Sequence, residues 1–527
     1  MVGVAHLEVP LRAAEGQERN GQEEEQVLES NIREGVLEWW GCRHTLCLMG
    51  FLGTATAYTV RTSLSIAIVA MVGVRAPNLT TAANISAEEG DVCPRPVDAD
   101  TSSALGPEGE FDWDERTQGV ILGAFFYGYT SSNFVGGRAA EYLGGRLVYG
   151  LGITISALLT FVTPFCARWA MEVLVALRVV EGFAQGVMFP AIISMLATWT
   201  SPRGKGAGKF TTFVHTGIQF GNIASLSLSG VLCSSGFLGG WPSVFYVFGA
   251  LGLLWGVSWF LLVHDRPETH PRISRRELQH IQACKNAVKS DVVVPLPWRE
   301  IVTSPPFWSI FLMNWASSYG LYTLMNGLPT YLRNIQHFNM SSSGVVSAAP
   351  YLSMWIVSIV WSVILDRLAT TKVMSVKMVR RVSTAFASYG QTTFLLLLCL
   401  VECNHTLVIV LLCAAVGASG TLFAGYNSSH QDIAPNLAGS LKGITNTFGS
   451  VAGVVAPSVT GYVTQNNQTI GAWRVVFIVT AVTYFVMGTI YLFLMTDQVQ
   501  PWNEPKENTA RKGKRDSTDS SSENQDC

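Results

Sequence analysis

One stretch, residues 54–71, reads TATAYTVRTSLSIAIVAM and places a single arginine, Arg61, inside a long apolar segment. Moving a guanidinium into hydrocarbon costs roughly 2.5–3.5 kcal/mol on insertion scales. A chain keeps such a charge where it faces a watery cavity or a partner group. Arg61 therefore predicts a bundle of membrane helices around a polar cavity and a ligand that carries negative charge.

The composition supports a membrane protein over the whole length. The chain has 527 residues, of which 49% are hydrophobic and only 14% are charged, whereas soluble domains carry about 25% charged residues. The 10 cysteines include no CxxC pair or Cys/His cluster, so we expect most to be small core residues and no metal site. The polar, acidic start of the chain does not resemble a cleaved signal peptide.

Apolar spans of about 20 residues recur along the chain. They lie near 45–74, 117–137, 147–166, 171–197, 210–233, 243–263, 306–332, 343–365, 382–401, 407–428, 441–463 and 474–495. The sequence thus predicts an all-α membrane protein with twelve transmembrane helices. A basic, polar linker at 264–305 separates six-helix halves at 45–263 and 306–497, flanked by a polar arm (1–44) and a disordered tail (498–527).

Two independent patterns predict the orientation. The connections after even-numbered spans are basic, which places them and both termini on the cytoplasmic side. Five glycosylation sequons fall on the opposite side, at Asn78, Asn84, Asn339, Asn404 and Asn467. We expect glycans at Asn78 and Asn84, in the long first outside loop, 75–112.

The connection between the second and third spans carries a recognisable motif. It reads GRAAEYLGGR from Gly137 to Arg146 and resembles the signature loop of the major facilitator superfamily, with Glu141 in place of the usual aspartate. The corresponding place in the second half reads Asp366-Arg367. The resemblance implies that fold, with two pseudo-symmetric halves, and gating by these five residues. The alternative is ordinary basic flanking of membrane spans.

The fourth span carries Arg178, Glu181 and Gln185 on one helical face. Arg178 and Glu181 can form an ion pair that neutralises both charges, or they can take part in function, as ionisable groups inside membranes commonly do. In the superfamily arrangement, the first, fourth, seventh and tenth spans line the cavity, so Arg61 would share it with this pair. Two cations against one acid leave room for a substrate carboxylate or phosphate.

Further polar residues in the spans are candidates for proton coupling or substrate binding. His215, in the fifth span, is either a proton relay for coupling or a core residue. Tyr58 lies one turn before Arg61, and neutral donors occur in the seventh and tenth spans at Tyr322, Asn326 and Tyr426. These side chains either bind the substrate or pack between helices. The pattern predicts that the first half supplies charge and the second supplies neutral hydrogen-bonding groups.

Four stretches carry a more specific resemblance. They read YTVRTSLSIAIVAM (58–71), WDERTQGVILGAFFYGY (113–129), HQDIAP (430–435) and GITNTF (443–448). From residue 45 to 497 the chain resembles the anion–cation symporter family, which contains sialin, the vesicular glutamate and nucleotide transporters and the sodium–phosphate cotransporters. The resemblance, nearest to sialin-like members, implies alternating access, anion recognition by Arg61, and coupling to protons or sodium.

Three positions depart from that pattern. Gln185 stands where sialin has a second acid, and Ile193 where a histidine follows the helix proline. Ser317 lies near the place of an arginine in vesicular glutamate transporters. A sialin-like proton mechanism would therefore rest on Glu181 alone, and a glutamate carrier is disfavoured.

The sequence as a whole predicts a secondary transporter of organic anions, such as sialic acid, acidic sugars or related carboxylates. A sodium-dependent phosphate cotransporter, a vesicular glutamate or other anion transporter, and a non-transporting receptor are the alternatives. We expect no enzyme, because no nucleophile–base pair or phosphate loop occurs, and no nucleic-acid binding, because basic residues sit at span ends. The expected partners are a small anionic solute and the bilayer, with no cofactor besides the coupling ion, H⁺ or Na⁺. We expect a monomer in the plasma membrane or in a lysosomal or vesicular membrane.

Overall fold

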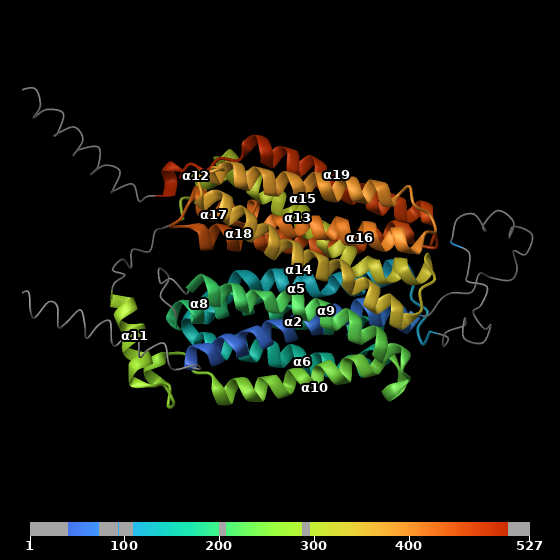
Figure 1. Ribbon diagram of the computed structural model, residues 1–527. Helices are drawn as coiled ribbons and strands as arrows, with labels where there is room; N and C mark the ends of the chain where they lie inside the picture. Colours follow the sequence, from blue (N-terminus) through green and yellow to red (C-terminus); the bar gives the residue numbers. More distant parts are fainter. Residues whose placement is uncertain (1–40, 73–92, 94–108, 200–206, 287–295, 504–527) are drawn as a thin grey trace, which may run out of the picture.

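The computed structural model describes residues 41–72, 93, 109–199, 207–286 and 296–503. All regular structure within these residues is helical. Figure 1 shows two groups of helices that lie side by side, one from each half of the chain. This arrangement confirms the predicted all-α membrane fold with two six-helix halves.

The first half comprises α2 (Cys42–Val72), α5 (Glu115–Leu143), α6 (Gly145–Trp169), α7 (Met171–Gly186) with α8 (Met188–Trp199), α9 (Ala207–Ser234) and α10 (Trp241–Leu262). The second half comprises α13 (Pro305–Asn334), α14 (Met340–Thr370), α15 (Val376–Leu398), α16 (His405–Ser419) with η4 (Gly420–Phe423) and α17 (Tyr426–Ile433), α18 (Ala438–Thr464) and α19 (Ile470–Leu494). These helices correspond to the twelve predicted spans.

Two spans predicted as continuous are broken. The fourth divides into α7 and α8, which meet at Val187. Pro190 has no N–H to offer the carbonyl of Gly186, so the regular bonding ladder is lost there. The tenth passes through η4, which tightens the turn between α16 and α17. Both breaks lie in spans predicted to line the cavity.

Seven spans among the described residues are long and apolar enough to cross a membrane by length and composition alone. The others, α5, α9, α13, α15 and α18, carry more polar residues. Several of these contact the opposite half, through the pairs α5–α18, α9–α14 and α2–α13. Because they face protein rather than lipid over part of their surface, they can hold polar groups that a lipid-facing helix could not.

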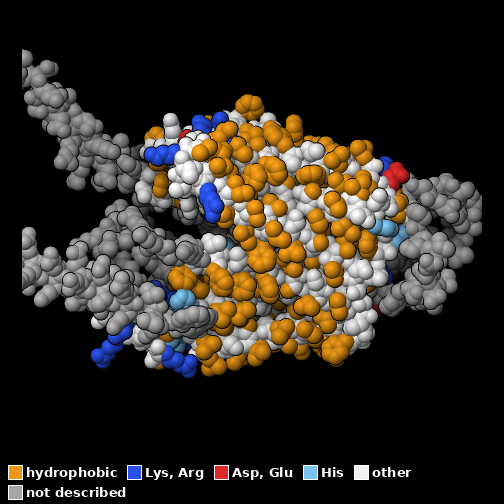
Figure 2. Space-filling view, viewed as in Figure 1, with side chains coloured by type: hydrophobic (Ala, Val, Ile, Leu, Met, Phe, Trp, Pro, Cys, Tyr) orange, Lys and Arg blue, Asp and Glu red, His pale blue; other side chains and the backbone are white. Residues whose placement is uncertain are grey.

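Two ends of the bundle can be defined by their connections. The linker end carries α11 (Arg275–Asn286) and α12 (Trp298–Thr303). There the Glu277 carboxylate accepts the backbone N–H groups of Cys42 and Arg43, each at 3.0 Å, and so caps the start of α2. Most of the Lys and Arg side chains visible in Figure 2 lie toward this end, whereas apolar side chains cover the flank of the bundle.

The opposite end, called here the disulfide end, is closed by a covalent bond between the halves. Cys93 and Cys403, 310 residues apart, form a disulfide that joins the segment before α5 to the α15–α16 connection. The sequence did not predict this pair; the six other cysteines among the described residues form no disulfide and are buried or partly buried. The sequon residues Asn339 and Asn404 cap α14 and α16 at this end.

The two halves approach each other unequally along their interface. At the disulfide end, a Cβ atom on Gly119 of α5 would lie 2.6 Å from the Pro457 carbonyl oxygen of α18. A Cβ atom on Gly344 of α14 would lie 2.6 Å from the Leu226 carbonyl oxygen of α9, so both contacts require glycine. Near the linker end of α18, Gly443 has no neighbouring atom within 4 Å of such a position. The halves therefore pack tightly at the disulfide end, whereas the surface of α18 at Gly443 is uncovered.

Candidate substrate site

Arg61 lies on α2, only 4% exposed, at the interface between the halves. Its Cζ atom is 4.5 Å from the ring centroid of Phe126. Four further rings surround it at 4.9 to 5.3 Å, those of Tyr58, Phe125, Tyr129 and Tyr322. Aromatic faces attract a cation, so this cage stabilises the guanidinium without neutralising its charge.

The hydrogen bonding of Arg61 is incomplete. Its Nη2 donates to the hydroxyl of Tyr322, on α13 of the other half, at 2.9 Å. Its Nε is buried and has no hydrogen-bond partner among the described residues. No carboxylate within that part of the chain forms an ion pair with it. Arg61 thus retains both a positive charge and a donor with which to receive an anion.

Arg178 of α7 is balanced within the chain. Its Nη1 lies 2.8 Å from Oε2 of Glu181, and the two side chains are 4% and 0% exposed. Thr160 of α6 donates to the other carboxylate oxygen at 3.2 Å. Arg178 also donates to the Arg61 carbonyl oxygen at 3.4 Å. The structure therefore forms the self-neutralising pair that the sequence left open, directly beside Arg61.

The remaining predicted binding residues divide into two sets. Tyr58 and Tyr322 belong to the Arg61 cage, whereas Asn326 binds α2 one turn further on, accepting from Ser65 at 2.9 Å. The Asn326 Nδ2 is buried without a partner among the described residues. Tyr426 instead donates to Asn314 at 3.1 Å, on the linker side of the cage.

His215 lies apart from the Arg178–Glu181 pair. Its Nδ1 donates to the Thr211 carbonyl oxygen at 2.8 Å on the same helix. Its ring stacks on Phe189 of α8, with centroids 5.5 Å apart. Among the described residues it makes no hydrogen bond to Glu181, so its role as a proton relay stays a prediction.

The gating motif lies at the linker end, where α5 ends and α6 begins. The backbone N–H of Arg146 donates to Asp265 at 2.7 Å, and its guanidinium donates to the Phe260 carbonyl oxygen. Asp265, directly after the sixth span, thus accepts a hydrogen bond from the start of α6. Gly137 lies within α5. The side chains of Glu141 and Asp366 fall outside the described residues, and Arg367 is exposed.

A second acid–base contact in the other half was also missed. Arg380 at the start of α15 binds Asp432 of α17 through Nε at 2.7 Å and Nη2 at 3.3 Å. Its Nη1 donates to the Ala424 carbonyl oxygen at 2.8 Å. The HQDIAP block that carried the family resemblance therefore fastens the broken tenth span to α15.

The prediction that the second half contributes only neutral groups was wrong. Lys442 of α18 places its Nζ against Oδ1 of Asn427 and 5.8 Å from the ring centroid of Tyr426. Lys442 is in the stretch GSLKGITNTF, at the start of the eleventh predicted span, but the sequence did not mark it as a candidate residue. The second half thus places a cation beside its tyrosine and asparagine side chains.

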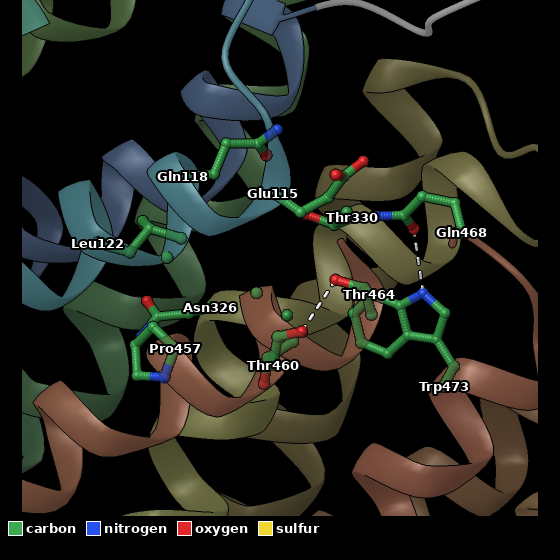
Figure 3. Close-up of a pocket in the computed structure, with 13 residues that line it drawn as sticks. Glu115, Gln118, Leu122, Asn326, Thr330, Pro457, Thr460, Thr464, Gln468 and Trp473 are labelled. Carbon is green, nitrogen blue, oxygen red and sulfur yellow. Dashed lines mark hydrogen bonds between the residues drawn. The ribbon is translucent and has the colours of Figure 1, made fainter. Parts of the chain in front are cut away.

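A separate small hollow lies at the disulfide end (Figure 3). Its wall includes Glu115 and Gln118 of α5, Asn326 and Thr330 of α13, and Thr460 and Thr464 of α18. Gln468 accepts a hydrogen bond from the Trp473 indole at 3.2 Å on one side of it. Asn326 is the residue that this hollow shares with the predicted substrate residues, so the hollow adjoins the Arg61 cage on its disulfide side.

Comparison with known proteins decides the family. Residues 46–457 match the model of the Major Facilitator Superfamily. The chain belongs to this superfamily. It is 36% identical over 468 residues to a "Putative inorganic phosphate cotransporter" of Drosophila ananassae, covering 87% of this chain and 94% of that protein. It is 34% identical to human sialin, covering 87% and 90% respectively.

These relatives place the chain in the sialin-like anion–cation symporter family, as the sequence motifs predicted. A solved bacterial homolog of the human lysosomal transporter Spinster, in an inward-facing and unoccupied conformation, shares the fold. Its TM-score is 0.64 at 14% identity, covering 87% of this chain and 99% of that one. The protein is therefore a multi-pass membrane protein and a secondary transporter of the superfamily type.

Proposed function

We propose that the protein transports small organic anions, such as sialic acid, acidic sugars or related carboxylates, with Arg61 as the anion contact. The observation that carries this proposal is the state of Arg61: a buried guanidinium in an aromatic cage, with a free Nε and no acid paired to it among the described residues. An arginine fork suits a carboxylate, which can accept two parallel hydrogen bonds.

Binding at Arg61 would act directly on the interface between the halves. The guanidinium donates across that interface to Tyr322. A substrate carboxylate that accepts a hydrogen bond from the same Nη2 group would replace this contact. The substrate and the Tyr322 hydroxyl therefore compete for one donor. Because a ligand shifts a conformational equilibrium only through unequal contacts with the two states, this competition gives the substrate a means of promoting the rocking of the halves.

Coupling to an ion gradient is proposed through Glu181. Protonation would remove the charge that now balances Arg178 and leave a second free cation next to Arg61. In that state the site would hold a substrate anion more tightly. Protons and sodium both remain candidates for the driving ion. Because Gln185 cannot titrate, a proton mechanism would use Glu181, with His215 as the relay nearer the linker end.

We further propose that the linker end faces the cytoplasm, where basic connections concentrate, and that the halves are open there in this structure. The disulfide end would then face the lumen or the outside, where disulfides persist. The motif residues of the two halves, Arg146 and Arg367 among them, would close the linker end in the opposite state. Asn78 and Asn84, which lie outside the described residues, are proposed glycan sites on a plasma, lysosomal or vesicular membrane.

Inorganic phosphate is the second candidate substrate. The 36% identical Drosophila protein bears that description, and an arginine also binds phosphate with two hydrogen bonds. The neutral donors at Tyr322 and Asn326 favour the larger organic anion, because bare phosphate leaves them less to bind. A vesicular glutamate-type activity has less support, since Ser317 stands near the arginine of those carriers.

The test is uptake into proteoliposomes with pH and sodium gradients imposed separately. Labelled sialate, glutamate, urate and phosphate are supplied one at a time to the wild type, to Arg61→Ala and to Arg474→Ala. Arg474 is a matched control because it is an exposed arginine paired with Glu402 at the disulfide end. We expect uptake of an organic anion by the wild type and by Arg474→Ala only. Normal uptake by Arg61→Ala would remove Arg61 from the site.

The coupling proposal has its own test in the same vesicles. Glu181→Gln should lose accumulation driven by a pH gradient while retaining exchange of substrate across the membrane. The variant keeps a hydrogen-bonding side chain of the same length, but it removes both the titratable carboxyl and the charge that balances Arg178. The pH dependence of uptake is therefore compared per folded molecule. An unchanged pH dependence would assign coupling to another group.

A further inference from the structure

Lys442 is a cation that the proposed function has not used. It lies half-buried on α18, with its Nζ against the amide oxygen of Asn427 and over the ring of Tyr426. No carboxylate within the described ranges forms an ion pair with it. A partly desolvated ammonium without a counter-charge is costly, so a chain that keeps one has a use for the charge.

The level of Lys442 in the bundle follows from helix geometry. Gly453 of α18 lies against Phe126, which in turn contacts Arg61 and Tyr322. Lys442 precedes Gly453 by 453 − 442 = 11 residues, which corresponds to about 16 Å along a helix. Its Cα therefore lies about 16 Å from the level of the Arg61 cage, toward the linker end, and its flexible side chain shortens that gap.

Lys442 also faces the other half of the molecule. It lies within electrostatic range of His215 on α9, in the first half, and of His430 on α17. A Cβ atom on the adjacent Gly443 would have no neighbour within 4 Å, so this part of α18 borders open space. Figure 1 shows α17 and α18 reaching the linker end of the bundle. Lys442 thus lies beside the path that an anion would follow between Arg61 and that end.

We propose that Lys442 is a second binding residue for the transported anion, on the linker side of Arg61. Its ammonium receives the carboxylate or phosphate group as the anion enters or leaves through the open linker end, exchanging the Asn427 oxygen for an anionic one. Because about 16 Å separates the two levels, a small anion contacts Lys442 and Arg61 in turn. A lysine suits such a transient contact, because it is a flexible point charge without a fixed fork.

This inference rests on the proposed function, and the experiment separates the two. Wild type, Lys442→Met, Lys442→Gln and Lys442→Arg are reconstituted in oriented proteoliposomes with labelled sialate, glutamate or inorganic phosphate. The KM for exchange is measured with substrate on the linker side and then on the disulfide side. Lys377→Met is the matched control, because Lys377 is an exposed lysine on α15 that lies 4.0 Å from Asp497.

We expect both neutral variants to raise the linker-side KM about tenfold, which corresponds to the loss of roughly one charged contact. The disulfide-side KM should change less than threefold, and Lys442→Arg should restore wild-type values. A linker-side KM within twofold of wild type in either folded neutral variant would overturn the inference alone. Failure of Lys442→Arg to restore it would also overturn it, by indicating a packing role. No uptake of any of the three anions by the wild type would overturn the proposed function and this inference together.

Discussion

Two arginines lie near the Phe125 ring, and they differ in what balances their charge. Arg61 and Arg178 place their Cζ atoms 4.9 Å and 5.2 Å from its centroid. Arg178 has a carboxylate of its own at 2.8 Å. Arg61 has five aromatic rings and the hydroxyl of Tyr322. The same side chain in the same membrane thus occurs once as an internally neutralised pair and once as an open charge.

This difference separates stability from function. A buried ion pair contributes little net stability, but the removal of one partner leaves a buried charge alone. A caged cation without a partner can be removed at little cost to the fold, whereas an anion loses its contact. Substitutions at Arg178 should therefore damage folding, and substitutions at Arg61 should damage transport.

The largest expected effect is on stability, at Arg178. Arg178→Met leaves Glu181 buried at 0% exposure with Thr160 as its remaining side-chain donor, and we expect a loss of about 3–5 kcal/mol in unfolding free energy. The double variant Arg178→Met/Glu181→Met should recover most of it, because no charge is then stranded. Thermal unfolding in detergent, followed by tryptophan fluorescence, measures both. A double variant no more stable than the single one would contradict the pairing.

The next largest effect is on transport, at Arg61. Arg61→Met should lower the uptake rate by about 100-fold or more, near 2.7 kcal/mol, because the anion loses two charge-assisted hydrogen bonds. Its thermal stability should stay close to wild type, since the aromatic cage accepts an apolar chain. Arg61→Lys should keep part of the uptake, because lysine retains the positive charge but cannot donate two parallel hydrogen bonds to a carboxylate. If Arg61→Met lost thermal stability but retained uptake per folded molecule, Arg61 would be a stabilising residue and not a transport residue.

The sequence predicted one member of this comparison better than the other. The local spacing of Arg178 and Glu181 is enough to bring them together, because residues three apart share a helical face. The cage around Arg61 depends on Phe125, Phe126 and Tyr129, which read as ordinary apolar span residues until α5 is placed against α2. Such contacts depend on how helices distant in sequence pack together, and local patterns in one amino-acid sequence do not specify this packing.

The same reason explains the other misses. The Cys93–Cys403 disulfide joins positions 310 residues apart, and no local pattern marks them as partners. Lys442 was not selected because its contacts with Asn427 and Tyr426 depend on how α17, a separate short helix, packs against α18. The twelve spans, by contrast, follow from apolar length alone, which is a local property. Only the breaks near Pro190 and η4 escaped that argument.

A smaller effect should appear at the contact that links Arg61 to the second half. Tyr322→Phe removes the hydroxyl that accepts from Arg61 at 2.9 Å while leaving the ring in the cage. Because the substrate is proposed to compete with this hydroxyl for the Arg61 Nη2 donor, the KM should fall; a rise would mean that the hydroxyl binds the substrate instead. One hydrogen bond corresponds to about 0.5–1.5 kcal/mol, or a two- to tenfold change. Initial uptake rates over a substrate series measure it, with Tyr462→Phe, an exposed tyrosine of α18, as control.

The smallest effect concerns an exposed pair of the same chemistry as Arg178–Glu181. At the disulfide end, Arg168 Nε lies 2.6 Å from Oε1 of Glu110, and the side chains are 46% and 40% exposed. The hydrogen bond from Arg168 lowers the pKa of the Glu110 carboxyl below its usual value of 4.5. A lowered pKa means that the pair stabilises the folded state above about pH 4.5, and that this contribution is lost as the pH falls through the folded-state pKa.

Because water screens exposed charges, the pair should contribute only about 0.2–1 kcal/mol. Arg168→Gln should therefore lower thermal stability slightly at pH 7 and by a smaller amount at pH 3, and salt should reduce the difference at pH 7. Thermal unfolding of both proteins across this pH range tests it. A difference of the same size at both pH values would mean that Arg168 acts by packing on Trp241, over whose ring its Cζ lies at 5.2 Å. The buried pair, shielded from solvent at both side chains, should show no comparable sensitivity to salt.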